Sequence, residues 1–287
     1  MLDKTSVLVC VVLGATLSTA HADTEPEADP GTAPHAASTP NGDGDDQLTL
    51  PKGRLLLNAF FEANLGNGAE FKPFSITPDI WYGVNDDLTV GLVHSGLGGG
   101  GFIGSVGDSL CLAGTANGCG DIYHNVGLDV RYKLKTGPLS YAVDGGVYAR
   151  SVDPLAIAVK LGISARWHKD KLAVELQPNV FIGVTERDGT VNPVTMVAVG
   201  GNKELANIPV TALYAIAPKI ALSLQTGLVL PFENTADTFT VPLSIGGHYS
   251  LNESLSLTLA FTFPAIVAGA NGGIDARTLT LGATYAF

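Results

Sequence analysis

The chain has 287 residues, of which 46% are hydrophobic and 15% are Asp, Glu, Lys or Arg, and its formal net charge is −11. A chain of this composition has no basic stripe, so we expect no nucleic-acid partner. It also lacks an uninterrupted spanning helix after residue 47, because its longest apolar stretch, 208–230, contains Pro218 and Lys219 at its centre. A helix would lose a backbone hydrogen bond and bury a charge there.

The first 22 residues predict a secretory signal peptide. Lys4 precedes an apolar core from Ser6 to Leu17, and Ala20-His21-Ala22 gives a small-residue cleavage pattern. The core is shorter than the roughly 20 residues that a membrane-spanning helix needs. We therefore expect cleavage after Ala22 and export from the cytoplasm.

Residues 23–47 predict a disordered periplasmic leader. They are rich in Pro and Ala, and they carry seven acidic residues and no Lys or Arg. Such a segment buries too little apolar surface to offset its conformational entropy. The rest of the chain, without these seven acids, is only mildly acidic.

Residues 48–287 predict one all-β domain, an antiparallel up-and-down transmembrane β-barrel of about 12 strands, within a range of about 10 to 14. Apolar residues recur at every second position, as in Leu128, Val130, Tyr132 and Leu134. Most predicted strands reach the roughly 9 to 11 residues that a tilted strand needs to cross hydrocarbon. The predicted strands are 54–65, 73–84, 88–95, 121–134, 139–150, 155–167, 172–184, 207–216, 220–230, 239–249, 255–263 and 277–287.

The predicted connections alternate between short turns and longer loops. The connections at 85–87, 135–138, 168–171, 217–219 and 250–254 are short, and those between them are long except for 151–154. Bacterial membrane barrels have short periplasmic turns and longer external loops. An even number of strands then places both termini in the periplasm.

The last strand carries the most specific motif. Thr280, Gly282, Tyr285 and the terminal Phe287 place polar, small and aromatic residues at spaced positions. This pattern resembles the terminal strand of bacterial outer-membrane β-barrel proteins, without indicating a particular family. The resemblance implies a location in the cell outer membrane, contact with its lipid, recognition by the barrel assembly machinery, and pairing of the last strand with the first. The motif and the turn asymmetry favour a membrane barrel over a soluble β-sandwich.

Alternation also selects the residues that line the lumen. We expect these side chains to balance in charge and to leave space between them at small residues such as Gly127 and Gly146. A barrel of about 12 strands lies between small filled barrels and wide porins, so a narrow aqueous pore is expected. The predicted acidic residues are Glu62, Asp79, Asp129, Asp144 and Glu175, and the basic residues are Arg131, Lys133, Arg150, Lys160 and Arg166.

The turn positions give a first estimate of register. They place Asp129 opposite Asp144, and Asp144 opposite Lys160, with Arg131 two residues along from Asp129. Two facing carboxylates repel each other unless a cation lies between them. We therefore expect Asp129, Arg131, Asp144 and Lys160 to form one network, which is either a structural charge cluster or a selectivity filter.

These features predict a small passive porin-like channel for small solutes or ions, with no cofactor and weak ion selectivity. One alternative is a closed barrel that acts as a surface anchor or adhesin through its external loops. A membrane-embedded lipase or protease is a third class, because His248-Tyr249-Ser250 has the H-x-S order of outer-membrane phospholipases. Alternation points His248 and Ser250 away from the lipid, so we assign no catalytic residue and expect no enzyme activity. His94 and His124, at lipid-facing positions, lack further ligands at a useful spacing, and we expect no metal site.

Cys111 and Cys119 are the two cysteines that remain after signal-peptide removal. Export places them in an oxidising compartment, and the seven residues between them include Gly and Asn, which allow the chain to turn back. We therefore expect them to form a disulfide in the largest external loop.

Overall fold

The computed structural model describes residues 48–66, 69, 73–95, 110–111, 122–188, 190–191, 198–199, 201–269 and 273–287. The expected signal peptide, the whole expected leader and Cys119 lie outside these residues. In the part of the chain that is described, no helix is long and apolar enough to cross a membrane. The helix α2 (Thr235–Thr238) is a single turn in the connection that follows residue 231.

The described strands form a closed antiparallel β-barrel of 12 strands, as the sequence predicts. Sequential strands pair with each other, and β1 pairs with both β2 and β16, which closes the ring. The segments β8 and β9 count as one interrupted strand, because both pair with β7 and β12. The barrel strands are β1 (Leu55–Asn64), β2 (Phe74–Asn85), β3 (Leu88–Val93), β5 (Val126–Lys135), β6 (Leu139–Val152), β7 (Leu155–Lys169), β8 (Leu172–Leu176), β9 (Asn179–Gly183), β12 (Leu205–Ala217), β13 (Ile220–Pro231), β14 (Thr240–Ser250), β15 (Leu255–Ala268) and β16 (Thr278–Ala286).

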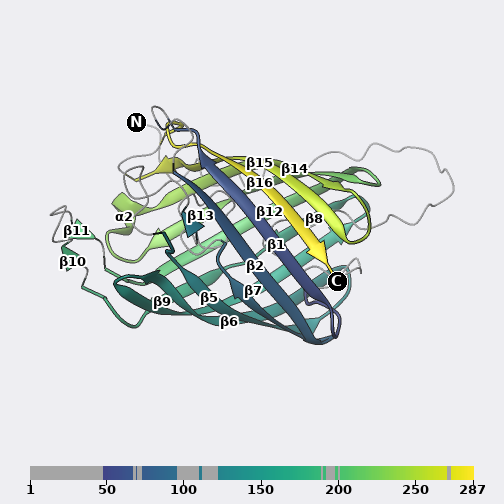
Figure 1. Cartoon of the computed structure of the whole chain (residues 1–287), viewed down its shortest axis with the longest axis horizontal. Coiled ribbons are helices and arrows are strands. Elements are labelled where there is room, and N and C mark those ends of the chain that lie inside the picture. The colour runs from purple at the N-terminus through teal and green to yellow at the C-terminus, as the bar shows by residue number, and fades with distance from the viewer. Residues whose placement is uncertain are drawn as a thin grey trace. The chain divides into compact units, whose positions relative to one another are not determined.

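Three further short strands are not members of the 12-strand ring. β4 (Leu110–Cys111) pairs with the start of β2, whereas β10 (Thr190–Val191) and β11 (Ala198–Val199) pair only with each other. We call the end of the barrel that holds the short connections, such as Asn85–Leu88 and Lys135–Leu139, the turn end, and the opposite end the loop end. The last strand β16 finishes at the turn end beside the start of β1, and β10, β11 and α2 lie at the loop end (Figure 1).

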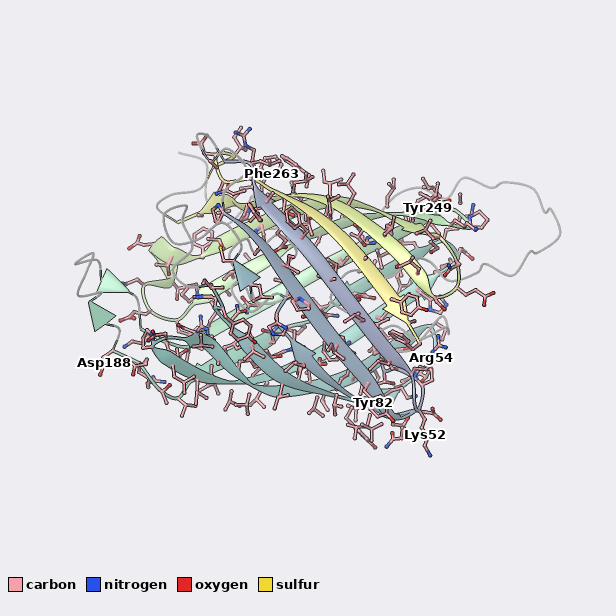
Figure 2. All side chains as sticks on the ribbon, in the orientation of Figure 1. Lys52, Arg54, Tyr82, Asp188, Tyr249 and Phe263 are labelled. Carbon is pink, nitrogen blue, oxygen red and sulfur yellow. The ribbon has the colours of Figure 1, made fainter. Side chains whose placement is uncertain are left out.

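Alternation separates the two faces of the barrel wall. The outward positions are apolar and exposed, as in Leu128, Ile163 and Leu259. Side chains cover the outside of the barrel along its length, and Tyr82 and Tyr249 lie near the turn end (Figure 2). The inward positions are mostly polar and buried, as in Asn58, Thr77 and Ser164. This pattern suits a barrel with lipid outside and polar contents inside.

The bounds of several predicted strands differ from those in the structure: the strand predicted at 121–134 begins at Val126, and the strand predicted at 88–95 ends at Val93. The prediction 172–184 is interrupted at Gln177 and Pro178, because proline has no N–H to donate to a neighbouring strand. Its carbonyl still accepts a hydrogen bond of 3.0 Å from Ile163 N, which keeps the wall continuous. The strand that we predicted to end at residue 263 continues to Ala268 and pairs there with Thr240.

The expectation that interior glycines leave open space is wrong. Gly127 lies directly opposite Tyr148 on the neighbouring strand, and a Cβ on Gly127 would come within 2.1 Å of the Tyr148 ring. Gly91 and Trp81 form a second pair of this kind, at 2.4 Å. Each glycine therefore makes room for an aromatic ring from the adjacent strand, and the ring fills the interior that the sequence appeared to leave empty.

Candidate functional site

All ten predicted lumen residues lie at inward-facing positions of their strands. Eight of them, on β5 to β8, form one side of the interior, which we call the charged wall. Glu62 and Asp79 lie on β1 and β2. The charged wall consists of Asp129, Arg131, Lys133, Asp144, Arg150, Lys160, Arg166 and Glu175.

Arg131 and Asp144 form the most buried ion pair of this wall. They are cross-strand partners on β5 and β6, and the Arg131 Nε donates to an Asp144 carboxylate oxygen. Ser164 on β7 donates to the other oxygen at 2.5 Å. The side chains of Arg131 and Asp144 are each only 4% exposed. A buried carboxylate with a cation and a hydroxyl group on its two oxygens is satisfied on both sides.

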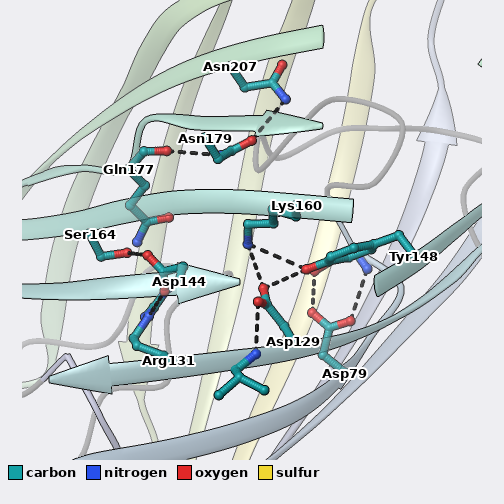
Figure 3. A network of polar contacts seen from close by, with 12 residues as sticks. Asp79, Asp129, Arg131, Asp144, Tyr148, Lys160, Ser164, Gln177, Asn179 and Asn207 are labelled. Carbon is teal, nitrogen blue, oxygen red and sulfur yellow. Dashed lines mark hydrogen bonds and ion pairs between the residues drawn. The ribbon is translucent and has the colours of Figure 1, made fainter. Parts of the chain in front are cut away.

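Lys160 and Asp129 form a second pair, which a tyrosine joins. Lys160 Nζ lies 2.6 Å from Asp129 Oδ2, and the Tyr148 hydroxyl donates to the same oxygen at 2.6 Å. Lys160 Nζ also lies 5.7 Å from the centre of the Tyr148 ring. Figure 3 shows Lys160, Tyr148 and Asp129 converging beside the pair of Arg131 and Asp144.

The structure brings the four expected side chains together, but the predicted register is wrong. Asp129 lies opposite Gly146, and Arg131 lies opposite Asp144. Lys160 also lies opposite Gly146, not Asp144. The difference arises at the turn, where Lys135 lies opposite Tyr141 and not residue 138, and the irregular pairing between Lys133 and Lys135 removes only one residue of this offset. The true register replaces two facing carboxylates with an ion pair, so no third group has to relieve a repulsion.

Tyr148 was missed by sequence reasoning, although a signal for it was present. It has the inward parity of Asp144 and Gly146 on the same strand. Gly127 lies against one edge of the Tyr148 ring, and Gly146 lies against the opposite edge. Phe181 packs edge-on against the same ring, at a centroid distance of 5.2 Å. A tyrosine that points inward, next to glycines and charged residues, indicates a ring that packs on the glycines and a hydroxyl group that binds the charged side chains.

A third pair lies nearer the turn end. Arg166 Nη1 is 3.5 Å from Glu175 Oε1, and the two residues are cross-strand partners on β7 and β8. Arg166 Nε is buried, and it has no hydrogen-bond partner among the described residues. The same holds for Gln177 Nε2 and Asn207 Oδ1 on the adjacent segments. Most buried polar atoms in proteins are hydrogen-bonded to protein groups or to ordered water.

The other charged interior residues lie apart from these pairs. Lys133 at the turn end lies 3.0 Å from Asp87 in the adjacent turn. Arg150 at the loop end donates to Asn202 Oδ1 at 3.1 Å and to the Lys203 carbonyl at 3.0 Å. Glu62 accepts a hydrogen bond of 3.4 Å from Thr280.

Asp79 fixes the end of strand β3. Its carboxylate accepts the backbone N–H of His94 at 2.7 Å and both the backbone N–H and the hydroxyl of Ser95. His94 is buried, not lipid-exposed as its parity suggested, because β3 ends at Val93. Its ring contacts the Pro78 carbonyl and the Tyr123 hydroxyl.

The opposite part of the interior is polar but uncharged. The strands β12 to β16 contain no Asp, Glu, Lys or Arg at any position. Thr262 donates to Ser244 at 2.7 Å, which is typical of the contacts there. We call the buried, inward-facing polar side chains of β13 to β16 the hydroxyl wall, which consists of Ser223, Gln225, Ser244, His248, Thr258, Thr262, Thr278, Thr280 and Thr284.

His248 belongs to this wall and does not form the contact that an H-x-S enzyme needs. Its Nε2 lies 3.0 Å from Ser223 Oγ and its Nδ1 lies 3.0 Å from Thr258 Oγ1. The serine beside it is therefore Ser223 on β13 and not Ser250. In the described ranges, no three His, Cys, Asp or Glu side chains gather in a group that could hold a metal ion.

The terminal motif lies at the seam of the barrel, where the last strand β16 pairs with the first strand β1. Gly282 faces Phe60 across the seam, and the Phe287 N–H donates to the Leu55 carbonyl at 2.9 Å. Tyr285 is outward-facing and packs on Phe287 at a ring-centroid distance of 4.5 Å. Pairing of the last strand with the first is thus confirmed, whereas the role of the motif in assembly stays a prediction. The disulfide also stays a prediction, since Cys111 is buried in β4 but Cys119 is outside the described residues.

Comparison with known proteins gives structural relatives only. No family model and no curated protein sequence matches the chain. The NanC porin superposes with a TM-score of 0.55 at 8% identity, covering 80% of this chain and 98% of that one. An outer-membrane channel of Pseudomonas putida F1 superposes with a TM-score of 0.53 at 15% identity, covering 86% of this chain and all of that one. The KdgM porin gives a TM-score of 0.50 at 8% identity, covering 81% and 99%.

This chain has the fold of outer-membrane porins and channels. At these identities the similarity establishes the barrel architecture and not what crosses it. What the interior can do depends on its own side chains.

Proposed function

We propose that this protein is a small passive channel of the cell outer membrane. The observation that carries the proposal is a closed ring of 12 strands with an apolar outside and a polar inside. A soluble barrel would bury apolar side chains within and expose polar ones. Here the inverse arrangement requires lipid around the barrel and suits water or polar solutes within it.

The paired charges of the interior bear on which ions such a channel passes. Arg131, Lys160 and Arg166 each lie beside a carboxylate, so their charges cancel locally. The strands of the hydroxyl wall contain no Asp, Glu, Lys or Arg. His248 is the one side chain there that can carry a positive charge, and it does so only when it is protonated. We therefore infer weak ion selectivity for small solutes and ions, with no cofactor and no catalytic step.

The orientation and assembly follow from the barrel class. We infer that the turn end faces the periplasm, with both chain termini there, and that the loop end faces outward. We also infer that the barrel assembly machinery inserts the chain through the terminal strand, with Phe287 as part of the signal. Outer-membrane lipid is then the partner of the apolar exterior.

A closed barrel that serves as an anchor or adhesin is the second candidate. It is favoured by the burial of many interior side chains, among them Asn58, Thr89 and Thr280, each at most 1% exposed. Such a protein would act through the connections at its loop end. It would insert into membranes without passing ions.

Planar-bilayer recording of the purified protein separates the two candidates. We expect ion conductance with a reversal potential near zero under a salt gradient. Replacing Lys160 with Glu places a second carboxylate beside Asp129, and we expect the reversal potential to move toward cation preference. Lys169→Glu makes the same charge change at an exposed position near the turn end and is the control.

One result would count against the channel, and another against a role of the charge network in ion selectivity. If the folded, inserted protein passes no current, the anchor is the better proposal. If Lys160→Glu lowers thermal stability but leaves conductance and selectivity unchanged, the charge network is structural and does not filter ions.

A further inference from the structure

A short segment before the first strand lies inside the barrel. Leu48, Thr49 and Leu50 are at most 2% exposed, although they belong to no strand. Pro51 to Arg54 form a tight turn at the barrel rim, closed by a hydrogen bond of 3.1 Å from Arg54 N to the Pro51 carbonyl. Gly53 has a φ of +82°, the left-handed conformation that such a turn requires. The chain therefore reverses at the rim, with Leu48 to Pro51 on the inner side.

Polar groups of three neighbouring elements hold this segment. Leu50 N donates to Thr89 Oγ1 on β3 at 2.7 Å, and Thr49 Oγ1 donates to the Asp86 carbonyl at 2.9 Å. The Leu48 carbonyl accepts from Arg131 Nη1 at 3.3 Å. Arg131 is thus shared between its ion pair and the segment. The segment reaches from the turn end up to the charged wall.

Apolar packing and shape complement these hydrogen bonds. Leu50 packs with Leu56, Trp81 and Val93, an apolar cluster within an otherwise mainly polar interior. Gly83 on β2 faces the segment so closely that a Cβ there would lie 2.0 Å from the Pro51 carbonyl oxygen and 2.7 Å from that of Leu50. The three nearest atoms to that Cβ all belong to the segment. The inner wall and the segment are therefore complementary in shape, and Gly83 leaves the space that the segment occupies.

We propose that Leu48–Pro51 is a strap that docks on the inner wall of β2, β3 and β5 and narrows the channel at its turn end. A segment held against the inner wall reduces the open cross-section of a pore, and hydrophobic constrictions can stop ion flow by dewetting. The proposal rests on the proposed channel function for its effect on current. The docking itself is independent of that function.

The full mature chain can be tested with a matched pair of glycine variants. Gly83→Ala puts a methyl group into the strap and should displace it, whereas Gly247→Ala lies on the outward parity of β14 and meets no atom within 4 Å. We expect single-channel conductance to rise by roughly twofold or more in Gly83→Ala and to stay unchanged in Gly247→Ala. Deleting residues 48–51 should reproduce the rise, and heat-dependent gel mobility checks that each barrel is folded.

A labelling experiment tests the docking without relying on current. Leu50→Cys is introduced after Cys111 and Cys119 have been replaced by Ser, and its reaction with a water-soluble maleimide is timed. We expect slow labelling alone, a several-fold faster rate when Gly83→Ala is added, and no change with Gly247→Ala.

The outcomes separate the two proposals. Equal conductance in the wild type, Gly83→Ala and the deletion overturns the strap as a constriction, and equal labelling rates overturn its docking. If no form conducts while the labelling rates differ, the channel function fails and the docked strap stands.

Discussion

The two sides of the barrel interior both bury polar side chains, but the partners that satisfy these side chains differ. The charged wall buries full charges and satisfies them in pairs, as with Arg131 and Asp144. The hydroxyl wall buries neutral groups that satisfy each other, as with Thr262 and Ser244. Losing one member of an ion pair leaves a buried charge, whereas losing one hydroxyl leaves a single unmet hydrogen bond. The charged wall should therefore tolerate substitution far less than the hydroxyl wall.

The largest effect is expected from Asp144→Ala, which leaves the Arg131 guanidinium without its carboxylate. We expect the free energy of unfolding to fall by about 3 kcal/mol, measured by urea titration in lipid vesicles. Replacing both partners, with Arg131→Met and Asp144→Leu, should recover most of this loss because no charge is left buried. A loss below about 1 kcal/mol for Asp144→Ala would mean that the pair behaves as a solvated surface pair.

A smaller effect is expected on the hydroxyl wall. Thr262→Val keeps the side-chain shape but removes the donor to Ser244, and we expect a loss of about 1 kcal/mol in the same assay. Adding Ser244→Ala should cost little more, since the acceptor is then gone as well. Ion selectivity should not change in either variant. A loss as large as that of Asp144→Ala would remove the contrast between the two walls.

The smallest effect is expected at an exposed pair outside the barrel wall. Arg187 donates to Glu204 at 2.6 Å near the loop end, and this hydrogen bond holds the pKa of the Glu204 carboxyl below its ordinary value of 4.5. A lowered pKa means that the pair contributes to stability above the ordinary value and is lost as the pH falls through the shifted one. Because both groups are exposed, we expect a measurable titration shift but no resolved change in global stability.

NMR titration of the Glu204 carboxyl checks this expectation. Its midpoint should move up toward the ordinary value in Arg187→Gln. Lys203→Gln, which removes a neighbouring positive charge without breaking the hydrogen bond, should move it much less. Equal midpoints in the wild type and Arg187→Gln would contradict the pair.

The contrast between the walls is visible in the sequence. Alternation assigned the inward face of Asp129, Lys160 and Glu175 correctly. The absence of acidic and basic residues from β12 to β16 is equally plain in the printed chain. The partner of each charge did not follow from alternation, because the turn pairs Lys135 with Tyr141 and an irregular pairing follows at Lys133. A register estimated from turn position alone does not contain that information.

By itself the sequence determined the strands, their two faces and the closed barrel, because a period of two and strand length are local properties of the chain. It also indicated which charges point inward. Only the tertiary structure decided that Arg131 and not Asp129 faces Asp144, that Tyr148 fills the space over Gly127, and that Leu48 to Pro51 fold back inside the ring. These features depend on contacts between residues far apart in the chain or on neighbouring strands. Such contacts are fixed by register and by the space that one strand leaves for another, and no local pattern encodes them.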